Sequence, residues 1–173
     1  MLISMKRVEV DLLDDMSLQS ACFGPLIQAY KEIRTRGDDE IKFYNELTNG
    51  QQALFMFRAF YEHARKSAED LYWWSAYFMA QTGRWPSLKR GLSYFEDVVA
   101  VTLIEDIERF LKERNHPRSL ENFDVTIQDL ENDSELLSSF EIFYARYQAV
   151  TPITIKRIGQ YIREHADEFL ALL

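Results

Sequence analysis

Glu113 and His116 form the one Glu-x-x-His pattern of the chain. Helical bundles use this spacing to hold iron or manganese. Such a centre needs two of these motifs on facing helices and two further glutamates. The chain has three histidines, of which only His116 has this spacing. Pro117 follows directly, and a helix cannot continue through it here without losing a hydrogen bond. The pattern therefore favours a capping or surface histidine, and we expect no metal and no cofactor.

Other patterns that carry catalysis are weak in this chain. Cys22 lies between Ala and Phe, as a small buried side chain would, and has no histidine near it in the sequence. Glu105 and Glu108 share a helix face with Arg109 and Lys112, which is typical of solvent-facing ion pairs. The phosphate-binding loop, the dinucleotide fingerprint, the nucleophile elbow and the zinc-protease motif do not occur. We therefore favour a function other than catalysis.

Negative charge is concentrated in one segment. Residues 119–149 hold seven acidic side chains and only Arg146 as a base, which accounts for −6 of the net charge of −8. An acidic face repels phosphate backbones and attracts basic proteins, so we expect a basic protein partner and no direct binding of nucleic acid. The alternative is a solvated acidic loop that keeps the protein soluble. The candidate partner-binding carboxylates are Asp129, Glu131, Asp133 and Glu135.

Aromatic residues are dense in the middle of the chain, and three of them are candidates for binding. Trp73 and Tyr77 share one stripe of a predicted helix, and Trp74 lies on the neighbouring stripe. Both stripes are buried if the helix is central. If the helix is peripheral, one stripe is an exposed surface of the kind found at protein interfaces, including that of a homodimer. A third prediction is a small-ligand pocket around Trp73 and Trp74 with His63 or Glu62 converging on it.

The ends of the predicted helices are marked more clearly than their interiors. Thr48 to Gln51 reads Thr-x-x-Gln, a capping box, and Ser67 offers a second N-terminal cap. Gly37 and Gly83 stand where helices end. The signals predict about six to seven helices, which begin near residues 25, 38, 48, 67, 86, 136 and 151.

Proline decides the two boundaries near the C-terminal half. After Pro86 one long apolar pattern runs to residues 115–117, with Gly91 inside it marking a close contact or a break. Thr151-Pro152 predicts the start of a separate helix, because Thr caps well and Pro fits the first turn. The alternation of Val8 with later apolar residues suggests a short extended segment near the N-terminus. We expect an all-α, single-domain bundle over residues 1–173.

Composition bounds the setting of the protein. The single Cys22 cannot form an internal disulfide. Acidic residues follow Lys6 and Arg7 where a signal peptide would be apolar, and no apolar run approaches the roughly 18 residues that a membrane span needs. We expect a cytoplasmic protein that does not enter a membrane.

Two stretches carry a resemblance to a known family. The stretch from Leu47-Thr-Asn-Gly-Gln-Gln51 to Tyr72-Trp-Trp, and the ending from Phe143-Tyr-Ala-Arg-Tyr147 onward, resemble a family of small acidic helical bacterial proteins that includes a DNA-mimic protein. The resemblance implies an all-helical fold, no enzymatic activity and an acidic surface that occupies a DNA-binding protein. The family has Asn-Gly-Gly-Phe where this chain reads Arg65-Lys-Ser-Ala-Glu-Asp70, so no site residues carry over.

Three functions follow as expectations. The first is a non-enzymatic interaction or regulatory protein whose partner is basic. The second is a ligand-binding or enzymatic helical domain with an aromatic pocket, and the third is an immunity or antitoxin-like protein that shares the acidic surface.

Overall fold

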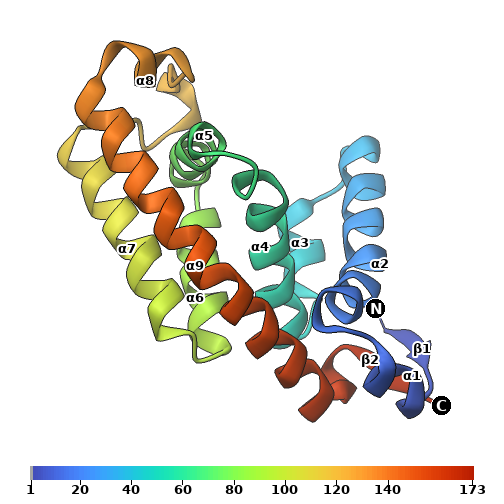
Figure 1. Ribbon diagram of the computed structural model, residues 1–173. Coiled ribbons are helices and arrows are strands. Elements are labelled where there is room, and N and C mark those ends of the chain that lie inside the picture. Colours follow the sequence, from blue (N-terminus) through green and yellow to red (C-terminus); the bar gives the residue numbers. More distant parts are fainter. Residues whose placement is uncertain (1) are drawn as a thin grey trace.

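The fold of the chain was obtained as a computed structural model, which describes residues 2–173. It consists almost wholly of helices, as the sequence predicts (Figure 1). Within the described residues there are nine α-helices rather than the expected six or seven, because short helices such as α1 and α8 have no pattern of their own. The α-helices are α1 (Arg7–Leu12), α2 (Asp15–Arg36), α3 (Glu40–Asn45), α4 (Asn49–Ala64), α5 (Ala68–Ala80), α6 (Arg84–Tyr94), α7 (Val98–Glu113), α8 (Gln128–Asn132) and α9 (Ser134–Glu164).

Local capping signals set several helix ends where they were expected. Thr48 and Gln51 form the capping box at the start of α4, and the Ser67 side chain accepts a hydrogen bond from the Asp70 N–H at the start of α5. Gly37 ends α2 with a φ of 73°, a left-handed conformation that glycine adopts without a steric cost. At the start of α3 the cap is Asp39 rather than Asp38.

The single long helix predicted after Pro86 is in fact two helices. The chain turns between α6 and α7 at Glu96, which has a φ of 56°. The buried Asp97 then caps α7 by accepting a hydrogen bond from the Ala100 N–H at 3.1 Å. The aspartate signal was present in the sequence, but the apolar pattern continues across it.

The separate helix start predicted at Thr151-Pro152 is wrong, because α9 runs unbroken through Pro152. A proline inside a helix costs about 3 kcal/mol, so tertiary contacts must hold the helix together there. On the C-terminal side of the proline, the Thr154 hydroxyl donates to Asp97 at 2.6 Å, and the Gln19 side-chain amide donates to the Ile155 carbonyl at 2.7 Å. Pro25 lies inside α2 in the same way.

The two ends of the described chain lie side by side (Figure 1). Strand β1 (Ile3–Met5) pairs in parallel with β2 (Leu170–Leu172), with Ile3 opposite Leu170. The extended N-terminal segment therefore exists, but its partner comes from the other end of the chain. Val8, which suggested it, belongs to α1 instead.

The carboxylate of Glu168 anchors the C-terminal segment to the start of α4. Glu168, in the short 3₁₀ helix Ala166–Glu168, accepts hydrogen bonds from the Tyr94 and Tyr161 hydroxyls and from the Gly50 N–H at 2.9 Å. Gly50 needs to be glycine, since a Cβ atom there would lie 2.5 Å from the Phe169 ring. The negative charge lies at the positive end of the α4 dipole.

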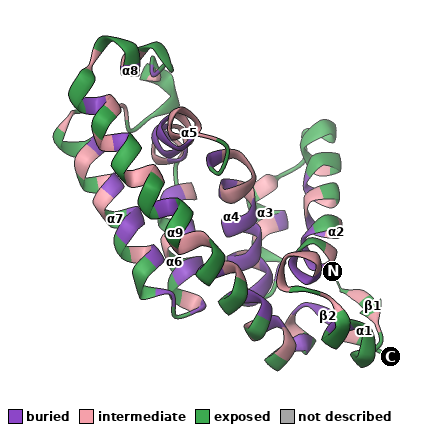
Figure 2. Cartoon of the chain, viewed as in Figure 1, coloured by how far each residue is buried: buried purple, intermediate pink, exposed green. Residues whose placement is uncertain are grey.

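The core is aromatic and centres on α4. Figure 2 shows α4 buried over most of its length, with α9 crossing the molecule on one side. Phe60 packs edge-on against Phe78, Trp85 and Tyr147, which come from three other helices. Helix α6 approaches α4 closely at Gly91, where a Cβ atom would lie 3.0 Å from the Ala53 Cα. This core holds α4 and α5 together, and we call the two helices the α4–α5 base. Helix α2 packs against α4 and α9, and α3 packs against α2.

Candidate ligand-binding groove

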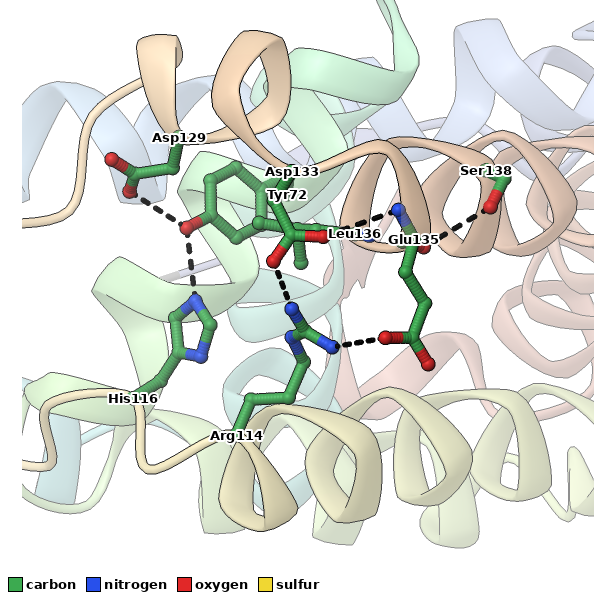
Figure 3. A network of polar contacts seen from close by, with 8 residues as sticks. All are labelled: Tyr72, Arg114, His116, Asp129, Asp133, Glu135, Leu136 and Ser138. Carbon is green, nitrogen blue, oxygen red and sulfur yellow. Dashed lines mark hydrogen bonds and ion pairs between the residues drawn. The ribbon is translucent and has the colours of Figure 1, made fainter.

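The predicted acidic residues gather at one end of the molecule, and three of the four make contacts within the protein (Figure 3). Arg114, at the end of α7, pairs with both Asp133 and Glu135 at the start of α9. The Asp129 carboxylate accepts a hydrogen bond from the Tyr72 hydroxyl at 2.9 Å. Glu131 is exposed. The exposed negative charge of this end is therefore smaller than the sequence count suggests.

Tyr72 is the centre of a buried polar network at this end. Its hydroxyl lies 2.9 Å from His116 Nε2 as well as 2.9 Å from Asp129. Since the hydroxyl donates its one proton to Asp129, His116 must donate from Nε2, which leaves its buried Nδ1 without a partner. Burial lowers the pKa of His116 below its ordinary value of 6.5. The histidine of the Glu-x-x-His pattern thus joins the loop after α7 to α5, and no group of three or more metal-ligating side chains occurs among residues 2–173.

Two more backbone-linked contacts complete this end. Asp133 accepts hydrogen bonds from the N–H groups of Glu135 and Leu136, and these bonds together with Arg114 lower the pKa of its carboxyl group. The whole arrangement closes the loop 114–133 onto the bundle.

The two neighbouring tryptophans of α5 take different directions. Trp73 stacks on Tyr77 with 4.8 Å between ring centroids, and its indole N–H donates to the Val125 carbonyl at 3.2 Å. Trp74 instead stacks on His63, with 3.8 Å between centroids and 15° between planes. All three predicted aromatic residues are half-buried. Trp73 holds the segment after α7, whereas Trp74 faces a cavity.

That cavity has a volume of about 600 Å³. We call it the α2 cavity, because α2 forms one wall and α4 and α5 form the other. Its principal lining residues are Phe23, Ile27, Tyr30, Lys31, Arg34, Arg58, Glu62, His63, Trp74, Tyr77, Phe78 and Arg84. The volume is typical of a small-molecule site. Trp74, His63 and Glu62, predicted to converge on a ligand, do lie together here, and Trp73 does not.

A second cavity, of about 590 Å³, adjoins the first. We call it the α3 cavity; Phe43 and Tyr44 of α3, Met56 of α4 and the turn around Gly83 line it. The two cavities share a set of lining residues, so we treat them as one groove. The shared residues are Tyr30, Glu40, Phe55, Gln81, Arg84 and Leu120.

Three of the shared residues form a polar junction where the cavities meet. The Tyr30 hydroxyl donates to Glu40 at 2.5 Å and accepts from Arg84 Nη2 at 2.7 Å. Arg84 Nη2 also lies 3.7 Å from the Glu40 carboxylate. Burial, followed by the bond to Glu40, raises the pKa of Tyr30. Glu40 is the most solvent-exposed of the three, with 41% of its side chain accessible.

Arg58 is the most deeply buried charge in the groove. Only 6% of its side chain is exposed, and it pairs with Glu62 one turn later on α4. Its Nη2 lies 3.3 Å from the Ser20 hydroxyl, but its buried Nε has no hydrogen-bond partner. Burial lowers the pKa of the guanidinium group. Its Cζ atom lies 5.6 Å from the centre of the Phe23 ring. The protein thus keeps a cation in an aromatic wall without satisfying all its donors.

The charge of the α2 cavity is opposite to that of the whole chain. Its lining carries four basic side chains and two acidic ones, in a protein with a net charge of −8. The basic members are Lys31, Arg34, Arg58 and Arg84, and the acidic members are Glu40 and Glu62.

Sequence reasoning did not identify Tyr30, Arg58 or Arg84 as site residues. One signal was available for Arg58, which interrupts the apolar face of α4 between Phe57 and Phe60, where a cation has to be buried. The junction had no such signal, because Arg84 comes from a different helix and lies 54 positions from Tyr30.

Comparisons with known proteins do not assign the chain to a family. No family model matches the chain, and neither does any curated protein or solved structure. The resemblance to the acidic helical family therefore remains a prediction. Along residues 2–173 no helix has both the length and the apolar character needed to cross a bilayer.

Proposed function

We propose that the protein binds a small organic molecule in the groove between α2, α3 and the α4–α5 base. The observation that carries the proposal is a cavity of about 600 Å³ that Arg58, His63 and Glu62 line beside the Trp74 ring. Known ligand sites combine an aromatic wall with a few fixed polar groups in this way. The polar groups here are already paired with one another, which suits holding a molecule more than attacking it.

The two walls of the groove differ in how far their residues are buried. The α4–α5 wall is part of the core, with Phe55, Phe60 and Phe78 nearly inaccessible to solvent. The α2 wall carries exposed residues toward its C-terminal end, among them Lys31 and Arg34. A ligand can therefore enter past the exposed end of α2 without disrupting the buried α4–α5 wall.

A basic protein partner for the acidic segment is the second candidate. It is favoured by the exposed side chains of Glu131 and Glu135, although Arg114 offsets part of that charge. An immunity or antitoxin-like role would use the same surface. The groove is preferred because its polar groups converge on one space, whereas three of the four predicted carboxylates are engaged within the protein.

Filling the α2 cavity tests the proposal. N-phenylnaphthylamine, a neutral probe that fluoresces in apolar surroundings, should bind the natural protein. Ala59 lines the cavity, so Ala59→Trp should place an indole in it and weaken probe binding at least about tenfold, because the probe loses its apolar contacts. Ala149 is exposed on α9, and Ala149→Trp is the matched control that should bind normally.

Two results would contradict the proposal. One is that the natural protein gives no fluorescence increase with this probe or with a charged analogue of it. The other is that Ala59→Trp, with an unchanged urea midpoint, binds the probe as tightly as Ala149→Trp.

A further inference from the structure

We infer that the ligand of this groove is an organic anion, with an apolar body and one carboxylate or sulfonate group held by Arg84 and Arg58. The inference rests on the proposed function and adds the chemical class of the molecule. Three observations support it: the sign of the charge in the α2 cavity, the incomplete neutralisation of the buried Arg58, and the alternative partner that Arg34 offers to the Glu40 carboxylate at the junction.

The charge of the lining is the first observation. Two more basic than acidic side chains face the α2 cavity, although acidic residues predominate in the chain as a whole. Low-dielectric walls strengthen the field of such a cluster inside the cavity. A neutral ligand would leave this excess charge uncompensated, whereas one anionic group would offset part of it.

Arg58 supplies the second observation. A guanidinium group has five N–H donors, and burial with an unused donor is unfavourable. Here Nε is buried without a partner and is not accessible from the cavity, so a ligand would act on Arg58 through its charge; the side chain lines the cavity and is only 6% exposed. Glu62, its one carboxylate partner, also lies 3.6 Å from Arg65 and is therefore shared. An anion in the cavity would add the charge that Glu62 only partly supplies.

The junction gives the third observation and the position of the anion. Glu40 accepts from Tyr30 and lies 3.7 Å from Arg84, the place that a ligand carboxylate would take. Glu40 has another partner available, since its second oxygen lies 3.8 Å from Arg34 Nε on the more exposed side. It can therefore move away from Tyr30 and Arg84 without losing all pairing.

The apolar part of the ligand is specified by the remaining lining. Phe23, Ile27, Trp74 and Phe78 surround the α2 cavity with rings and a branched aliphatic chain. Aromatic walls of this kind accept either a ring system or a folded alkyl chain. The ligand therefore has its charge near the junction and its body along α4 and α5.

Two probes with the same rings isolate the contribution of the charge. N-phenylnaphthylamine is neutral, and anilinonaphthalene sulfonate adds one sulfonate. Hydrogen bonds to charged groups contribute about 1.5–3 kcal/mol, so the sulfonate should bind the natural protein roughly 10- to 100-fold more tightly. Arg84→Gln should weaken the sulfonate about tenfold and the neutral probe far less. Arg157 is exposed on α9 and lines neither cavity, so Arg157→Gln should leave the preference intact.

A variant that gains affinity keeps the test independent of folding defects. Glu40→Gln removes the competing carboxylate while retaining the side-chain shape, and it should tighten sulfonate binding several-fold without a similar gain for the neutral probe. Equal affinity of the two probes in the natural protein, or equal loss of both in Arg84→Gln, would overturn the anion inference while leaving a binding groove. If neither probe binds, the proposed function fails as well.

Discussion

The Tyr72 network and the Tyr30 junction are made of the same parts but lie in different surroundings. Each places a tyrosine hydroxyl between a carboxylate and a basic side chain: Asp129 and His116 around Tyr72, and Glu40 and Arg84 around Tyr30. Tyr72 is fully inaccessible to solvent and lines neither the α2 cavity nor the α3 cavity. Tyr30 is 9% exposed and lines both cavities. The same kinds of contact fasten a loop in one place and line a groove in the other.

Two arginines repeat the contrast. Arg114 holds two carboxylates from the start of α9, and its side chain is 24% exposed. Arg58 is more buried, holds one carboxylate that is shared with Arg65, and keeps an unpaired Nε. A satisfied guanidinium at a helix end is best explained as structural. Arg58, which shares its one carboxylate and lines the α2 cavity, leaves positive charge that the proposed anion would offset.

Removing the hydroxyl group of Tyr72 or of Tyr30, one at a time, should give the largest difference in stability between the two regions. Tyr72→Phe removes a fully buried hydroxyl and leaves the half-buried Asp129 and His116 without their shared partner, and we expect a loss of about 2 kcal/mol in the free energy of unfolding. Tyr30→Phe should cost less than about 1 kcal/mol, because water can reach Glu40. Urea unfolding of both variants measures the difference. Equal losses would show that the junction is as closed as the network.

Replacing the arginines with methionine should have a smaller effect in the same direction. Arg114→Met leaves Asp133 and Glu135 without a cation, and we expect a loss of about 1 kcal/mol, as is usual for partly exposed ion pairs. Arg58→Met should change the stability by less, since methionine fills the aromatic wall and Glu62 keeps Arg65. The same urea titrations apply. A larger loss for Arg58→Met would assign Arg58 a structural role and remove one support for the anion site.

The pH dependence of stability should show the smallest effect and sharpen the picture of the closed end. Burial lowers the pKa of His116 in the folded state, so the unfolded chain takes up the proton first as the pH falls below about 6.5. Stability contributed by neutral His116 is therefore complete above pH 6.5 and is lost progressively below it. Denaturant midpoints between neutral and mildly acidic pH should fall less steeply in His116→Asn than in the natural protein.

His165 provides the control for that titration. It is exposed at the end of α9, so His165→Asn should retain the natural slope. His63 also contributes stability that is lost as the pH falls, because burial and, to a smaller extent, Lys66 lower its pKa. An unchanged slope in His116→Asn would contradict the lowered pKa, because it would mean that His116 takes up its proton at the same pH in the folded and unfolded chain.

What the sequence could predict was local. Thr48 and Ser67 cap helices through bonds to residues three positions ahead, so spacing alone reveals them. Pro152 was misinterpreted because the contacts that keep α9 continuous involve Asp97 and Gln19, which lie far away in the chain. Propensity describes a segment by itself, and packing against other segments overrides it.

The candidate site divides in the same manner. Counting charges located an acidic segment, but counting assumes that each carboxylate faces solvent, and Arg114 and Tyr72 could not be assigned to it from spacing. The predicted pocket around Trp73 and Trp74, with His63 or Glu62 converging on it, depended on two neighbouring helices. Trp74, His63 and Glu62 line the α2 cavity, whereas Trp73 does not. The contribution of α2 and of Arg84 arises only when α2 folds back on the α4–α5 base.

The pairing of β1 with β2 has a consequence for the order of folding. It joins Ile3 to Leu170, the contact that closes nearly the whole described chain into one loop, and each strand has only three residues. Loop closure costs entropy that such short strands recover poorly until the helices have brought them together. The pair should therefore form last and open first. In native-state hydrogen exchange, the Leu173 amide, which donates to the Met5 carbonyl, should lose protection well before the amides of α4.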